Sequence, residues 1–201
     1  MSLWTDFNDA PDAQAFEAIP PGTAVKVRLS IRPGGYNDPS QGLTNGIATR
    51  SKHSDAIYLD GEFVVLDGPY AKRKIWTMIG IYSSKGPEWT NMGRQLIKGI
   101  LNSAHGLRAD DNSPGAQQKR CINDLSALQG MVFVAKVGLE SDNRDGSLKN
   151  TIKSAISAEH PAYAQVMGSV TSQNAPTAHH APIAQDTPRP NPPSTRPAWA
   201  Q

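Results

Sequence analysis

Basic and aromatic residues recur at alternate positions in two segments of this chain, residues 24–32 and 73–82. The positions between them are mostly apolar, and a strand points successive side chains to opposite sides. Both segments therefore predict half-buried strands with a polar and aromatic outward side. The outward positions hold Lys26, Arg28, Ser30 and Arg32 in the first segment and Lys74, Trp76, Met78 and Tyr82 in the second.

This combination of side chains suits single-stranded nucleic acid. Lysine and arginine neutralise phosphates and release counterions, and aromatic rings stack on bases with little sequence preference. Further candidates lie in the polar connection after residue 32 and in the turn before residue 73. The predicted nucleic-acid-binding residues are Lys26, Arg28, Arg32, Tyr36, Arg50, Lys52, Lys72, Arg73, Lys74, Trp76 and Tyr82.

The same residues have a second interpretation. Trp76 and Met78 could belong to a second buried face, covered by a helix or by the aromatic residues of the N-terminal segment. Residues 72–74 could equally form a solvated hairpin end instead of a phosphate-binding patch. The pattern leaves both alternatives open, because alternation shows that a strand has two sides but not what covers them.

Catalytic patterns are missing from the sequence. It has no glycine-rich phosphate loop, no zinc-protease helix, no nucleophile elbow and no kinase signature. The single cysteine, Cys121, rules out an internal disulfide and is expected to be a small buried thiol. His179 and His180 have no third metal ligand nearby. We therefore predict a binding protein and not an enzyme, with no metal and no cofactor.

Strand-like segments and one helical segment follow each other in a recognisable order. Three strands, a helix and two strands are the element order of the OB-fold, a five-stranded barrel. The sequence therefore predicts a mainly β, OB-like barrel with one main helix and Gly61 at a bulge. The predicted strands are 24–32, 56–66, 73–82, 131–139 and 148–156; the main helix is 87–104, with short helices near 117–123 and 159–167; and residues 36–55 form a polar connection with an extended piece near 47–50.

In the main helix, an apolar stripe is expected to face the core. Its positions recur at helical spacing. They are Trp89, Met92, Leu96, Ile97, Ile100, Leu101 and Ala104.

Composition divides the chain into two parts. Hydrophobic residues make up 38% of it, and the shortage is concentrated at the C-terminal end, where proline, serine, threonine and alanine dominate. Such a segment cannot bury enough apolar surface to offset its ordering entropy. We therefore expect a folded domain over residues 1–167 and a disordered, Pro-rich tail over residues 168–201.

Charge is small in sum but unevenly distributed. The formal net charge is +2, yet residues 1–22 carry four acids and no lysine or arginine. Segregation of this kind can create surfaces of one sign. No apolar run is long enough to cross a bilayer, and the N-terminus lacks the basic and apolar segments of a signal peptide. These features predict a cytoplasmic protein that does not bind membranes.

Four stretches carry a resemblance to a known family: WTDFNDA at residues 4–10, IPPGT at 19–23, EFVVLDGPYAKRKIW at 62–76 and LQGMVFVAKV at 128–137. Together they resemble a family of unknown function encoded by phages and integrative elements. Its members often lie beside recombination or replication genes. The resemblance covers roughly residues 4–167 and implies a single-stranded-DNA-binding role, but it transfers no functional residue.

The tail resembles those of bacterial single-stranded-DNA-binding proteins only in part. It is Pro-rich and has Trp199 near its end, but it lacks their acidic tip, since Asp186 is its only acid. The leading hypothesis is a sequence-tolerant single-stranded-DNA-binding protein that acts in phage or mobile-element replication and recombination. It could form homo-oligomers and bind recombination or replication proteins. The alternatives are an accessory interaction module of a recombination complex or virion, and a nucleic-acid-processing enzyme.

Overall fold

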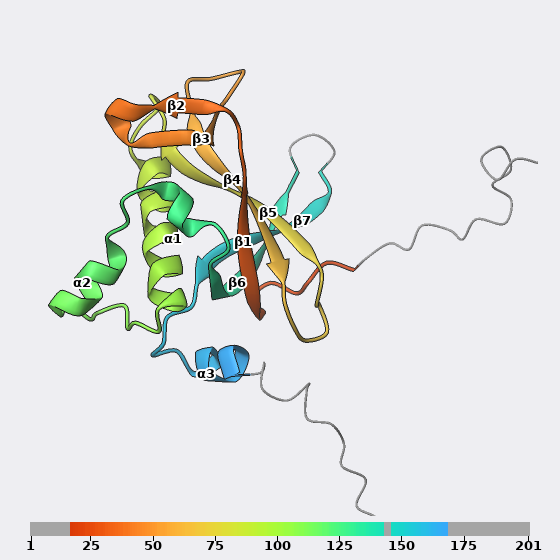
Figure 1. Cartoon of the computed structure of the whole chain (residues 1–201). Helices are drawn as coiled ribbons and strands as arrows, with labels where there is room; N and C mark the ends of the chain where they lie inside the picture. The colour runs from red at the N-terminus through yellow and green to blue at the C-terminus, as the bar shows by residue number, and fades with distance from the viewer. Residues whose placement is uncertain (1–16, 143–145, 169–201) are drawn as a thin grey trace, which may run out of the picture. The chain divides into compact units, whose positions relative to one another are not determined.

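The computed structural model describes residues 17–142 and 146–168. The predicted tail at 168–201, apart from Gly168, and the N-terminal aromatic residues therefore lie outside the described residues. The described part is mainly β, with a curled antiparallel sheet and three α-helices (Figure 1). The strands are β1 (Ala24–Arg32), β2 (Tyr36–Asp38), β3 (Leu43–Arg50), β4 (Ile57–Val65), β5 (Lys74–Tyr82), β6 (Val132–Ser141) and β7 (Leu148–Ala155), and the helices are α1 (Glu88–Ala104), α2 (Pro114–Arg120) and α3 (Pro161–Gly168), with short 3₁₀ helices η1 (Pro39–Gln41) and η2 (Leu125–Leu128).

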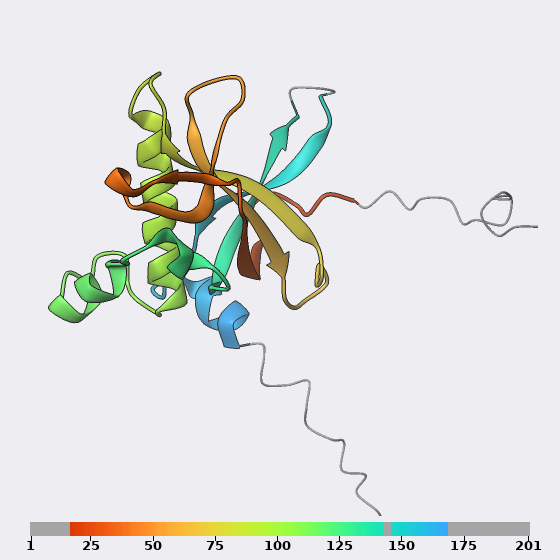
Figure 2. The same ribbon diagram turned by 45° about the horizontal axis from the view of Figure 1, so that its top comes forward.

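Strand β1 lies at the centre of the sheet. It pairs with β4 on one edge and with β6 on the other, while β4 pairs with β5 and β6 pairs with β7, all antiparallel. The sheet curls until β5 and β7 come together (Figure 2). There the Thr77 hydroxyl accepts a hydrogen bond from the Ile152 amide (2.8 Å) and lies 3.1 Å from the Thr151 hydroxyl. The predicted mainly β architecture with one main helix is confirmed.

The core lies inside this curl. The inward residues of β1 are Val25, Val27, Leu29 and Ile31, each at most 6% exposed, as their alternation predicts. Phe63 of β4 meets Phe133 of β6 edge to face, with ring centroids 6.0 Å apart. Burying a large apolar side chain stabilises the fold by roughly 1.5–3 kcal/mol. Burial of these inward side chains produces the alternating pattern from which the strands were predicted.

The expected count of five strands is wrong, because residues 36–50 form the additional β2–β3 hairpin. Its buried side chains are few and irregularly spaced: Leu43, Ile47 and Ala48. Partners from elsewhere hold it in place, since the Thr44 hydroxyl donates to the Asp124 carboxylate beside η2. No alternation marks these short strands, and for that reason the sequence indicated only an extended piece near 47–50, which β3 contains, within a polar connection.

Helix α1 packs on β5 through two glycines. A Cβ on Gly93 would lie 1.9 Å from the Gly80 carbonyl oxygen, and a Cβ on Gly80 would lie 2.7 Å from the Trp89 ring. The helix therefore approaches the strand more closely than any side chain permits. Gly93 faces the strand, and the preceding residue Met92 is 62% exposed. Met92 was expected in the apolar stripe facing the core, and that expectation is wrong.

The predicted bulge at Gly61 is also wrong. Pairing continues unbroken through Gly61 opposite Thr77, and the register shifts instead between Gly80 and Tyr82, where β5 carries the extra residue Ile81. Gly61 has a packing role, because a Cβ there would meet the Phe63 ring at 2.7 Å. A glycine within a strand indicates either a bulge or close packing, and here it is close packing.

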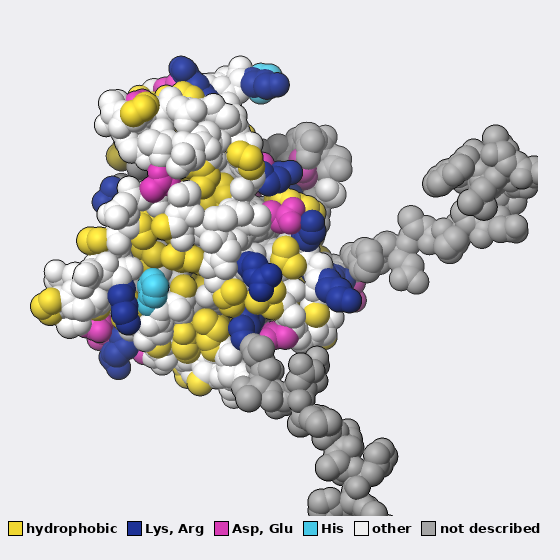
Figure 3. Space-filling view, viewed as in Figure 1, with side chains coloured by type: hydrophobic (Ala, Val, Ile, Leu, Met, Phe, Trp, Pro, Cys, Tyr) yellow, Lys and Arg dark blue, Asp and Glu magenta, His cyan; other side chains and the backbone are white. Residues whose placement is uncertain are grey.

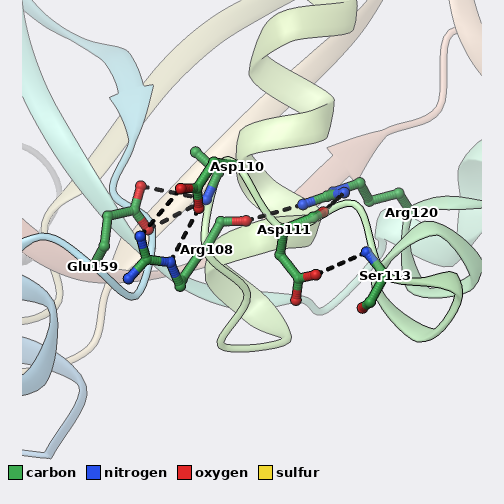
Figure 4. A network of polar contacts seen from close by, with 7 residues as sticks. Arg108, Asp110, Asp111, Ser113, Arg120 and Glu159 are labelled. Carbon is green, nitrogen blue, oxygen red and sulfur yellow. Dashed lines mark hydrogen bonds and ion pairs between the residues drawn. The ribbon is translucent and has the colours of Figure 1, made fainter.

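A polar network holds the connection between α1 and α2 (Figure 4). The Arg120 guanidinium donates to the carbonyl oxygens of Arg108 (2.9 Å) and Asp111 (2.5 Å). Arg108 in turn donates to Asp110 at 3.0 Å and keeps the pKa of that carboxyl below its ordinary value. Cys121, at the end of α2, is exposed. The predicted buried thiol is wrong, because α2 ends at the surface.

Residues 17–19, which precede β1, lie at one end of the curled sheet. Ile19 is fully buried there, and the Asn150 side chain holds its backbone by accepting from the amide (2.9 Å) and donating to the carbonyl (2.8 Å). Just before it, the Glu17 carbonyl accepts a hydrogen bond from Arg73. Residues 17–19 therefore lie next to the hairpin that joins β4 to β5. None of the helices among the described residues has the length and apolar character to cross a bilayer.

Candidate nucleic-acid interface

The outward side of β5 is open. Trp76 is 49% exposed and Met78 is 60% exposed, whereas Ile75 and Ile79 on the inward side are buried. The alternative in which a helix buries Trp76 is therefore wrong, and cover by the N-terminal aromatic residues lies outside the described residues. Large apolar side chains at this exposure are available to a ligand or a partner.

Tyr82 does not continue this row. The bulge at Ile81 interrupts the alternation and puts Tyr82 opposite Ile57, which points into the core. Directly opposed residues share one side of a sheet. Tyr82 is 43% exposed, but the expectation that it shares a face with Trp76 is wrong. The Trp76 row continues instead to Gly80, over which the Trp89 ring lies.

Lys26 was expected on the exposed side of β1, and it is buried. Its exposed fraction is 6%, and its ammonium group donates to the Met167 carbonyl of α3 at 3.0 Å. Val134, its partner across the strand pair with β6, is fully buried on the same side. Helix α3 covers this end of the outward side, so Lys26 cannot contact a nucleic acid without displacing that helix.

Two acids on β4 lie between the predicted cations. Arg32 pairs with Asp60 at 2.6 Å, and Lys74 pairs with Glu62 at 3.0 Å. The hydrogen bond that Arg32 donates to Asp60, more than the charge of that carboxylate, raises the pKa of Arg32. In the strand register Glu62 also lies directly opposite Trp76. The alternation of β4 could have revealed both acids, since they occupy its outward positions.

The remaining predicted residues lie on the central strand β1 and in the connections around β3 and β5. Arg28 on β1 and Lys52 after β3 are exposed. Arg50 stacks over the Tyr36 ring at 5.9 Å to the centroid, at the β2–β3 hairpin. In the β4–β5 hairpin, Lys72 has a left-handed backbone (φ 68°) and is exposed. On the face seen in Figure 3, basic and acidic side chains are interspersed and do not form one positive patch.

Residues that the sequence did not single out complete the open side. A hollow of about 570 Å³ lies where β5, β7 and α1 meet, and we call it the β5–α1 groove. Lys149 and Lys153 of β7 are exposed along it, and Lys149 pairs with Asp142 at 3.4 Å. The alternation of β7 was the available signal for both lysines. The groove is lined by Trp76, Met78, Trp89, Met92, Lys149 and Lys153, by the acids Asp60 and Glu140, and by further apolar and polar residues.

This arrangement can bind a flat group against apolar side chains while ammonium groups contact an anion beside it. Bases and phosphates have these two properties. Among residues 17–142 and 146–168, no group of three or more His, Cys, Asp or Glu side chains is placed to hold a metal ion. Comparison of the sequence with models of known protein families and with curated proteins gives no match.

Proposed function

We propose that this protein binds single-stranded DNA with little sequence preference, and that it binds rather than catalyses. The observation that carries the proposal is the half-exposed Trp76 ring at the edge of the β5–α1 groove, with Lys149 and Lys153 along the same hollow. A base that stacks on an aromatic ring gains roughly 1–3 kcal/mol whatever its identity. The adjoining lysines supply the phosphate contacts.

We further propose that the core is an OB-like barrel. Five strands support this, because β1 pairs with β4 and β6, β4 pairs with β5, and β6 pairs with β7. Helix α1 follows the third of these strands, as in the OB-fold, and the β2–β3 hairpin is an insertion after the first. OB-folds bind oligonucleotides on the face of their second and third strands, which here are β4 and β5.

Stacking contributes more to the proposed binding than the sequence suggested. The ion pairs of Arg32 and Lys74 offset two of the predicted cations. Exposed cations remain at Arg28 of β1, Lys72 of the β4–β5 hairpin and Lys153 of β7. The salt dependence of the affinity for nucleic acid grows with the number of phosphates that the protein neutralises. Because ion pairs offset Arg32 and Lys74, we expect a moderate salt dependence.

The deciding experiment compares Trp76→Ala with Tyr82→Ala in the full chain. The two aromatic side chains are similarly exposed, but only Trp76 borders the groove. By fluorescence anisotropy of a labelled oligo-dT strand, Trp76→Ala weakens binding roughly 5- to 100-fold, and Tyr82→Ala changes it less than about twofold. Equal losses, or no binding by the unaltered protein at low salt, contradict the proposal.

A second candidate function is favoured by the methionines. Met78 and Met92 are 60% and 62% exposed on opposite walls of the groove, and methionine adapts to varied apolar partners. The protein would then be an accessory module of a recombination complex or virion. Capture of a partner that survives nuclease and moderate salt and is lost in Met92→Ala supports this function. In either case the proposed setting is phage or mobile-element DNA replication and recombination.

A further inference from the structure

The N-terminal residues that precede the described part have the composition of a nucleic-acid mimic. Residues 1–16 contain Asp6, Asp9 and Asp12 and no lysine or arginine. They also contain three aromatic residues. Carboxylates and rings are the groups that a surface built for phosphates and bases attracts. This segment is therefore complementary to the open side of β5.

The structure shows where the segment joins the fold. Ile19 is held by Asn150, and the Glu17 carbonyl accepts from Arg73. Arg73 lies between Lys72 and Lys74, where β5 begins. Residue 17, at which the segment joins the fold, thus lies close to the start of the strand that carries Trp76 and next to the exposed Lys72.

We propose that residues 1–16 dock in cis on the outward side of β5 and compete there with single-stranded DNA. The acids take the place of phosphates at Lys72 and the neighbouring cations, and an aromatic ring takes the place of a base at Trp76. The competition with DNA rests on the proposed function. The docking itself does not, since it needs only the complementary surfaces.

The length of the segment is sufficient. A flexible chain of 16 residues has an end-to-end distance of about 20–24 Å. β5 has nine residues, and at roughly 3.3 Å per residue it spans about 30 Å, with Trp76 close to its start. A tether of this length gives the segment an effective concentration near the millimolar range. Weak contacts are then enough to occupy the surface until a DNA strand displaces them.

The test uses the full chain with Asp6→Asn, Asp9→Asn and Asp12→Asn combined. We expect this triple variant to bind oligo-dT about fivefold or more tightly than the unaltered protein, a typical size for coupling between two ligands. A matched control makes the same charge change elsewhere, with Asp110→Asn, Asp111→Asn and Glu159→Gln in the network of Figure 4. An equal gain in this control overturns the proposal, because net charge alone would then explain the effect.

A measurement without DNA separates the docking from the DNA-binding function. The indole N–H signal of Trp76 is followed by NMR and assigned through Trp76→Phe. It is expected to move in the N-terminal triple variant and at high salt, while the amide of the buried Ala116 on α2 stays in place. An unmoved Trp76 signal overturns the docking even if DNA binds. A moved signal without DNA binding supports the docking and removes the proposed function.

Discussion

Lys26 on β1 and Trp76 on β5 hold equivalent positions in the sequence pattern, but they have opposite environments in the fold. Each is on the outward side of a nine-residue strand whose inward side is apolar. Lys26 is 6% exposed beneath α3, and Trp76 is 49% exposed beside a groove. The comparison shows that an outward position is available for binding only where no later element crosses it. Helix α3, far along the chain, decides this for β1 (Figure 1).

The largest expected effect comes from the close contact between α1 and β5, which borders the β5–α1 groove. Gly93→Val forces a Cβ to within 1.9 Å of the Gly80 carbonyl and pushes α1 away from β5. We expect a loss of roughly 3 kcal/mol or more of unfolding free energy, since overpacking against backbone cannot relax easily. Urea denaturation measures it. Gly115→Ala, in α2 with open space around its Cβ, is the control and keeps or raises stability.

The second prediction concerns the end of β1 that α3 covers. Lys26→Ala removes a buried stem and the hydrogen bond to the Met167 carbonyl, which leaves that carbonyl unpaired. We expect a loss of about 1–2 kcal/mol in thermal or chemical unfolding. Arg28→Ala, two residues along on the same side but exposed, is expected to change stability by less than about 0.5 kcal/mol. Equal losses of stability in the two variants would contradict the burial of Lys26 beneath α3 and the exposure of Arg28.

The third prediction tests the charges beside Trp76 on the outward side of β4 and β5. Glu62→Gln frees Lys74 from its ion pair at 3.0 Å and removes the charge opposite Trp76. Each additional phosphate contact with a single strand steepens the salt slope by about 0.7, or roughly fivefold in affinity near 0.1 M salt. Oligo-dT titrations at several salt concentrations measure both quantities. Glu159→Gln, whose carboxylate contacts the Ala109 amide away from the sheet, is expected to leave the slope unchanged.

The smallest effect is a pH dependence at the β2–β3 hairpin. The Ser126 hydroxyl, and next the Thr44 hydroxyl, donate to Asp124 and hold its pKa below its ordinary value near 3.8. A carboxyl whose pKa is lower in the folded state contributes stability above its unfolded pKa and loses it as the pH falls through the folded value. The stability difference between the unaltered protein and Asp124→Asn is therefore expected to stay constant from pH 7 to about 5 and to shrink below about pH 4. A difference that grows in acid would contradict this assignment.

Predictability from the sequence differed between elements. Strands β1, β4, β5, β6 and β7 could be predicted because each buries one full side against the core, and that burial leaves an alternating pattern. Helix α1 could be predicted from its apolar spacing and from Pro87 before its first turn. The β2–β3 hairpin could not, because contacts such as that between Thr44 and Asp124 join residues 80 positions apart.

The sequence predicted the strand that carries the candidate site, but not all of the residues that form it. Trp76 is where the pattern indicated, since it follows directly from the alternation of β5. Tyr82 differs because a bulge at Ile81 changes the side it faces, and bulges leave little trace in composition. The acids of β4 and the lysines of β7 became part of the surface only when their strands were paired and curled next to β5.

The sequence by itself determined most of the core-facing residues of the main strands, because burying an apolar side chain is favourable whatever its neighbours are. It also determined the order of the main elements and the separation of acidic from basic segments. Only the tertiary structure decided which outward residues remain open, which charges are paired and where the groove lies. These properties depend on how distant segments cross one another. No local pattern records that, since a salt bridge or a covering helix joins residues whose spacing in the chain is arbitrary.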